Sequence, residues 1–120
     1  MKLNYITLMV RDIEKSMEFY QKLVGLQVMK QLDLEMGKIR FMANAKGETM
    51  IELIEFNKGE KVQTEGLVMS YQSDENLETI RDLAINLGYT PSEIITQQPK
   101  PKYFTVLDPD GIVVEFTSFS

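Results

Sequence analysis

The chain has 120 residues, of which 43% are hydrophobic and 26% are charged, and its formal net charge is −5. This length and composition fit one globular domain with no membrane-crossing segment, and the acidic balance argues against a nucleic-acid partner. The first residues lack the apolar core and cleavage site of a signal peptide, so we expect a cytoplasmic protein.

A strand and a helix are the first elements expected along the chain. Residues 3–10 alternate in the manner of a strand, which places Ile6, Leu8 and Val10 on one face and Tyr5, Thr7 and Met9 on the other. A helix is predicted over 13–24, with Asp12 as its N-cap and Gly25 as its C-terminal stop.

Three strands and a linker complete the first half of the chain, and the same order then repeats. The strands are expected over 27–34, 38–43 and 49–56, and a polar linker over 57–65. The second half is expected to hold a strand over 67–72, a helix capped by Ser73 or Asp74 and ended by Gly88, and strands over 92–97, 103–107 and 112–119. The prolines of the segment 97–102 cannot pair fully inside a sheet, so this segment is predicted to be an edge loop near the mouth of a pocket.

An internal repeat supports this organisation. An offset of 63 residues superimposes Gly25 on Gly88, Phe41 on Phe104, Glu52 on Glu115 and Phe56 on Phe119. The sequence therefore predicts an α+β fold over residues 1–120, a single domain made of two βαβββ modules that span 1–56 and 66–120.

The last two predicted strands are joined by Asp108-Pro-Asp-Gly111, whose residue types favour a type I turn. Such a turn fixes the register of the hairpin, because a slip of one residue would move every side chain to the other face. On this register Glu115 shares a face with Val113 and Thr117, and by the same alternation Glu52 shares a face with Met50 and Ile54.

Two carboxylates therefore lie at matching places in the two modules, on faces that are otherwise apolar. Burying a carboxylate is costly unless it is paired, hydrogen-bonded, neutralised or bound to a cation. The pair predicts a shared cavity. The alternative is that both carboxylates point to water, or pair with Lys102 or Arg40 as structural ion pairs.

Three segments carry a resemblance to a known family. The opening YITLMVRDIEKSMEFY over 5–20, the helix end LVGL over 23–26 and the closing FTVLDPDGIVVE over 104–115 resemble the vicinal oxygen chelate superfamily, the group of glyoxalase I, bleomycin-resistance proteins, fosfomycin-modifying enzymes and extradiol dioxygenases. The resemblance covers the whole chain. It implies two modules that form an incurved mixed sheet with a concave ligand-binding face, and a homodimer in which that face is built within one chain or across two.

The resemblance also implies where a metal would bind. Relatives draw their ligands from the first and last strands of each module, places that fall on Tyr5, Glu52, Leu67 and Glu115 here. Histidine and cysteine are absent from the chain, leucine cannot ligate, and a neutral tyrosine is a poor ligand for a divalent ion. We therefore expect no cofactor, and the alternative is a divalent metal ion held by the two glutamates.

With the metal set aside, strand alternation predicts a pocket with apolar walls and two acids, a composition typical of small-molecule sites. Its lining would be Tyr5, Thr7, Met9, Met50, Glu52, Ile54, Leu67, Met69, Tyr71, Val113, Glu115 and Thr117, and all of these except Ile54, Val113 and Thr117 are predicted ligand-binding residues. The methionines suit a variable or aromatic ligand, and core filling is their alternative role.

The expected function is sequestration of a small, planar or cationic organic molecule by a metal-independent protein of the bleomycin-resistance type. Glu52 and Glu115 would be counter-charges, Tyr5 and Tyr71 would be walls, and no residue would act as a catalyst. Two alternatives stay open. One is a metal-dependent lyase, isomerase or dioxygenase that uses the two glutamates, and the other is an interaction module whose pocket is vestigial.

Overall fold

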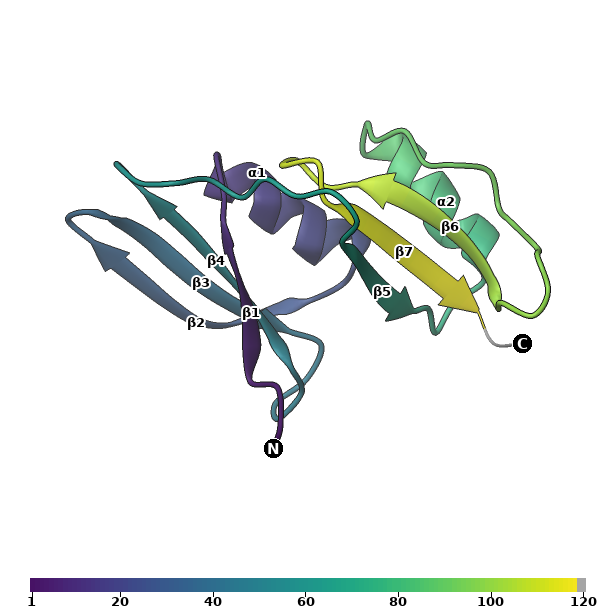
Figure 1. The fold of residues 1–120 in the computed structure, drawn as a ribbon, viewed down its shortest axis with the longest axis horizontal. Coiled ribbons are helices and arrows are strands. Elements are labelled where there is room, and N and C mark those ends of the chain that lie inside the picture. The colour runs from purple at the N-terminus through teal and green to yellow at the C-terminus, as the bar shows by residue number, and fades with distance from the viewer. Residues whose placement is uncertain (119–120) are drawn as a thin grey trace. The chain divides into compact units, whose positions relative to one another are not determined.

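A computed structural model describes residues 1–118, and it confirms the predicted α+β class (Figure 1). The elements are β1 (Tyr5–Met9), α1 (Ile13–Glu18), a π-helical turn (Phe19–Leu23), β2 (Gln27–Leu34), β3 (Gly37–Ala43), β4 (Met50–Phe56), β5 (Val68–Gln72), α2 (Leu77–Asn86), β6 (Lys102–Leu107) and β7 (Val113–Ser118). The chain divides into two compact units between residues 63 and 64, inside the predicted linker.

The first unit is a four-stranded sheet in the order β1-β4-β3-β2, with β1 parallel to β4 and the other neighbours antiparallel. Strand pairing places Thr7 opposite Glu52, and Glu52 opposite Phe41. These three side chains therefore share one sheet face. Leu8 and Val10 point to the other face and are buried, as the alternation of β1 predicts.

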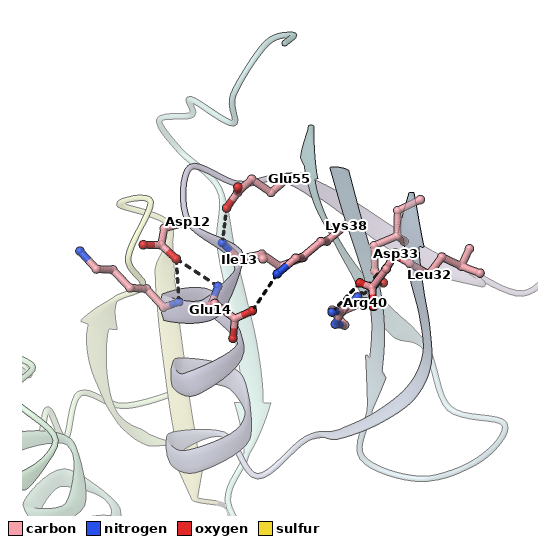
Figure 2. Close-up of polar contacts among 10 residues, drawn as sticks. Asp12, Ile13, Glu14, Leu32, Asp33, Lys38, Arg40 and Glu55 are labelled. Atoms are coloured by element: carbon pink, nitrogen blue, oxygen red, sulfur yellow. Dashed lines mark hydrogen bonds and ion pairs between the residues drawn. The ribbon is translucent and has the colours of Figure 1, made fainter. Parts of the chain in front are cut away.

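Polar contacts hold α1 to the sheet of its own unit (Figure 2). The predicted N-cap is confirmed, because the Asp12 carboxylate accepts from the amides of Glu14 at 3.1 Å and Lys15 at 3.2 Å. The amide of Ile13 donates to Glu55 of β4 at 2.7 Å, and Glu14 pairs with a lysine of β3 at 3.6 Å. A cap of this kind satisfies amides that have no partner within the helix.

The linker is anchored to the first unit. The amide of Val62 donates to the carbonyl of Met9 at 2.6 Å, and the Arg11 guanidinium donates to the carbonyl of Val62 at 2.8 Å. Lys61 and Val62 are half-buried, so this part of the predicted connector packs beside β1 and is not freely solvated.

The second unit is a three-stranded sheet in the order β5-β7-β6, with β5 parallel and β6 antiparallel to β7. Helix α2 runs alongside β6 and β7 (Figure 1). The helix begins later than predicted. Its N-cap is Asn76, whose side chain accepts a hydrogen bond from the Glu78 amide at 2.8 Å, and not Ser73 or Asp74. The Ser73 hydroxyl instead forms a local turn with Glu75.

The strand predicted over 92–97 was wrong. The segment forms one isolated bridge to β6, between Ile95 and Tyr103, and the Ser92 amide also donates to the Thr105 carbonyl of β6 at 2.8 Å. Pro91 and Pro99 bracket it, and a proline lacks the N–H that a ladder needs. The segment therefore runs along β6 without becoming a full strand.

The turn between β6 and β7 is confirmed. The amide of Gly111 donates to the carbonyl of Asp108 at 3.0 Å, and the buried Asp108 carboxylate accepts from the amides of Asp110 at 2.8 Å and Ile112 at 2.9 Å. Phe119, predicted to end the last strand, lies outside the described residues. Over residues 1–118, neither helix has the length and apolarity needed to cross a bilayer.

Candidate functional site

The first carboxylate of interest is Glu52, on the central strand β4 of the first unit. Its residue surface is 9% exposed, and the Thr7 hydroxyl donates to its Oε1 at 2.5 Å. Phe41 lies opposite it on β3, and the ring of Tyr5 meets the Phe41 ring edge-on, with centroids 5.3 Å apart. Among the described residues, no lysine or arginine forms an ion pair with Glu52. The site is thus a buried carboxylate with one hydroxyl donor and an aromatic neighbour.

The second carboxylate is Glu115, on the central strand β7 of the second unit. The Ser70 hydroxyl donates to its Oε1 at 2.7 Å, and the Lys100 ammonium lies 3.9 Å from its Oε2. The same ammonium stands over the ring of Tyr103, 5.0 Å from the centroid. Glu115 therefore has a hydroxyl donor, as Glu52 does, and a cation as well.

The two hydroxyl–carboxylate pairs are structural equivalents. Each joins the first strand of its unit to the last through a parallel pairing, Thr7 with Glu52 and Ser70 with Glu115, and both pairs span 45 residues of sequence. Ser70 was not among the predicted site residues, although the offset of 63 residues that superimposes the two glutamates also superimposes Ser70 on Thr7. Lys100 and Tyr103 were not predicted either, and the sequence carries no periodic signal for them.

The sheet faces that strand alternation predicted agree with the register in the first unit, and in part in the second. The register places Tyr5, Thr7, Met9, Met50 and Ile54 on the face of Glu52, and Val113 and Thr117 on the face of Glu115. Their role in ligand binding stays a prediction.

Met69 and Tyr71 were wrongly placed on the face of Glu115. Met69 lies opposite Val114 and is 7% exposed, and the Tyr71 ring lies 6.4 Å from that of Phe116. Both belong to the opposite face of the sheet. Burial raises the pKa of Tyr71 to about 12, and the nearby charge of Asp108 adds to the rise.

Leu67 was wrongly taken as the counterpart of Tyr5. It precedes β5, and Val68 is the residue that stands opposite Val113 as Tyr5 stands opposite Met50. This error of one residue explains the misplacement of Met69 and Tyr71, because a shift of one position changes the face of every side chain in a strand.

Phe41 and Phe104 match in the sequence repeat but differ in place. Phe41 lies opposite Glu52, whereas the residue opposite Glu115 is Thr105. Phe104 is fully buried on the other face and stacks on Phe116, with ring centroids 5.2 Å apart. The aromatic ring beside the carboxylate in the second unit is instead that of Tyr103, which lies under Lys100.

The alternative prediction, that Lys102 or Arg40 forms an ion pair with the two glutamates, was wrong, because both cations pair with other acids. Arg40 is buried on the opposite face from Glu52, where it pairs with Asp33 at 2.8 Å (Figure 2). Lys102 pairs with Glu78 at 3.4 Å. The hydrogen bond to the Lys102 ammonium also helps to lower the pKa of Glu78, after the larger effect of a backbone hydrogen bond.

The donor set does not suit a transition metal. Among residues 1–118, no group of three or more acidic side chains is arranged so that it could hold a metal ion. The positions beside each glutamate on the parallel strand are filled by a hydroxyl, which donates to the carboxylate and makes a weak ligand. Each carboxylate is better suited to accept hydrogen bonds or to face an organic cation.

The sequence model of the Glyoxalase/Bleomycin resistance protein/Dioxygenase superfamily matches residues 2–116. The chain belongs to this superfamily. Another protein of similar sequence is the uncharacterized protein YwbC of Bacillus subtilis (strain 168), which is 30% identical over 96% of this chain and 95% of its own length.

Solved structures of other proteins share the fold of this chain. TnmS3, an antibiotic binding protein from Streptomyces sp. CB03234, is 18% identical, with a TM-score of 0.79 over 100% of this chain and 97% of its own. Glyoxalase I of Leishmania major is 16% identical, with a TM-score of 0.80 over 98% of this chain and 86% of its own. The same fold therefore occurs in a binding protein and in an enzyme. The fold alone does not decide between binding and catalysis for this chain, so the residues of the site must be considered.

Proposed function

We propose that this protein binds a small, positively charged organic molecule and that it does so without a metal ion. The observation that carries the proposal is the repeated hydroxyl–carboxylate pair, Thr7 with Glu52 and Ser70 with Glu115. Two equivalent acids, each on an inner strand of its sheet, are costly to bury unless they are hydrogen-bonded or paired with a cation. An organic cation would supply the counter-charge that Glu52 lacks among the described residues, and at Glu115 it would take the place of Lys100.

The surroundings of Glu52 support a cation with an apolar body. A carboxylate has about four acceptor sites, and the single hydroxyl of Thr7 uses one of them, so further donors can be accepted. Tyr5 and Phe41 present aromatic surface next to the acid, and a cation that lies beside an aromatic ring and a carboxylate is attracted by both. Met50, opposite Tyr5, adds a flexible and polarisable side chain.

The chemistry of the donors supports metal independence. Histidine and cysteine are absent from the whole sequence, and Val68 is at the place equivalent to Tyr5. A transition metal would have to rest on isolated carboxylates whose neighbours are hydroxyl donors. TnmS3, a structural relative described as an antibiotic binding protein, is a precedent for binding on this fold.

Calorimetric titration of the full-length protein tests the proposal. Benzyltrimethylammonium is the probe, and benzyl alcohol is the uncharged control. We expect the probe to bind more tightly than the control. Glu52→Gln and Glu115→Gln should each weaken binding of the probe at its own carboxylate by roughly 10- to 100-fold, the equivalent of losing a charged interaction of about 1.5–3 kcal/mol. Glu93→Gln, which changes an exposed acid paired with Arg81, should leave affinity unchanged. Unaltered affinity in both glutamate variants would contradict the assignment.

The homodimer expected from the resemblance stays a prediction, as does the cytoplasmic location. Size-exclusion chromatography with light scattering at micromolar concentration should give twice the mass of the 13.8 kDa chain. A monomer under these conditions would contradict the dimer without touching the proposal for the ligand.

A further inference from the structure

Lys100 already occupies a cation position in the second unit. Its ammonium lies 3.9 Å from Oε2 of Glu115 and 5.0 Å from the centroid of the Tyr103 ring. A carboxylate together with an aromatic face is the same pair of groups that we assign to recognition of a ligand cation.

The contact of Lys100 with Glu115 is built to be weak. The lysine side chain is 63% exposed, whereas that of Glu115 is 14% exposed, and 3.9 Å is at the outer limit for an ion pair. Lys100 lies between Pro99 and Pro101 in the loop that precedes β6, and its amide donates to the carbonyl of Gln97 at 3.0 Å. Exposed pairs of this kind contribute little to stability, because water and salt compete with them.

Two comparisons within the chain indicate that this placement is specific. Lys102, only two residues along, is directed to Glu78 instead, at 3.4 Å. In the first unit, no lysine or arginine among the described residues pairs with Glu52, although its hydroxyl bond is equivalent. Among the described residues, only Glu115 of the two carboxylates therefore has a cation from the chain itself.

We infer that Lys100 is an internal counter-ion that a ligand must displace from Glu115 and Tyr103, and that it thereby sets the specificity of this position. The inference rests on the proposed function. A ligand whose cation is more strongly attracted to the aromatic ring and less strongly hydrated than a lysine ammonium replaces it. A small, well-hydrated ammonium ion gains too little to do so, because it offers the same charge without additional apolar contact.

The test compares Lys100→Met with Lys102→Met in the full-length protein. Methionine keeps an unbranched apolar stem and removes the charge. In calorimetric titrations, Lys100→Met should bind benzyltrimethylammonium roughly three- to tenfold more tightly than the unaltered protein, the range expected for removing a weak ion pair and an exposed cation–π contact. Lys102→Met should bind it as the unaltered protein does, and benzyl alcohol should not distinguish the three proteins.

Three further outcomes keep the inference separate from the proposed function. Combining Lys100→Met with Glu115→Gln should remove the gain in affinity, because the position that the lysine occupied is then uncharged. Affinity that is unchanged or weaker in Lys100→Met, while Glu115→Gln still weakens binding, would overturn the inference and leave the proposed function intact. Binding that neither Glu52→Gln nor Glu115→Gln alters would overturn both.

A measurement without a ligand checks the starting geometry. The ring protons of Tyr103 should shift in the NMR spectrum of Lys100→Met relative to the unaltered protein, and should stay in place in Lys102→Met. An unmoved Tyr103 signal in Lys100→Met would overturn the inference, since the ammonium would then not lie over the ring.

Discussion

Replacing Thr7 with valine should destabilise the folded protein by about 1–2 kcal/mol. A hydrogen bond to a charged group contributes about 1.5–3 kcal/mol, and the Thr7 hydroxyl is the donor to Glu52 at 2.5 Å. Water can reach Thr7, which is exposed, and this lowers the expected loss. Valine has the same shape and favours strands, so the change isolates the hydroxyl.

The equivalent change in the second unit is the control. Ser70→Ala removes the hydroxyl that donates to Glu115, but Glu115 keeps Lys100 and is more accessible to water, so the loss should stay below about 1 kcal/mol. Thr7→Ser keeps a donor and should recover most of the stability lost in Thr7→Val. Urea unfolding followed by circular dichroism measures all three variants. A loss for Thr7→Val no larger than that for Ser70→Ala would refute the reasoning.

Two further predictions concern Tyr71 and Gly37. Because burial raises the pKa of Tyr71 from 10.0 to about 12, the folded state holds this proton more tightly, and stability should fall by about 2 kcal/mol as pH rises from 10 to 12. Tyr71→Phe should lack this part of the loss in urea unfolding at pH 9 and pH 12, and an identical pH dependence in both proteins would contradict the cause. At Gly37, where φ is 152°, a Cβ would lie 2.1 Å from the carbonyl oxygen of Glu55, so Gly37→Ala should cost at least about 3 kcal/mol in thermal unfolding. Gly47→Ala, where φ is 90° and an added Cβ would have no neighbour within 4 Å, should cost only about 1 kcal/mol, and equal losses at both positions would contradict the steric argument.

Features with a local chemical cause could be predicted from the sequence. The side chain of Asp12 caps α1 because it reaches two amides within three residues, and Asp108-Pro-Asp-Gly111 forms its turn from contacts within itself. Strand β2 has the predicted bounds, 27–34. In each case the deciding interactions lie close together in the chain.

Features that depend on distant strands were harder to predict. The parallel pairing of β5 with β7 sets which side of β5 faces Glu115, and no turn connects those two strands to fix the register. The alternation of Met69 and Tyr71 with Ser70 could have given the answer, since the two larger apolar side chains belong with the buried face. The position of Lys100 depends on a proline-containing loop, which has no alternating or helical pattern of apolar residues from which it could be predicted.

The start of α2 shows a third kind of error. Ser73, Asp74 and Asn76 are all good N-cap residues, and sequence preference alone cannot choose among them. Packing decides, because a helix that begins at Leu77 buries that side chain and Ala84 on one face.

Native mass spectrometry of the protein after dialysis against EDTA, with benzyltrimethylammonium added, tests metal-free capture of an organic cation most directly. We predict a complex with the probe, no bound divalent ion, and no complex when Glu52→Gln and Glu115→Gln are combined. A probe complex that forms only after a divalent ion is restored, or a stoichiometric ion that survives dialysis and is lost from the combined variant, would contradict this prediction.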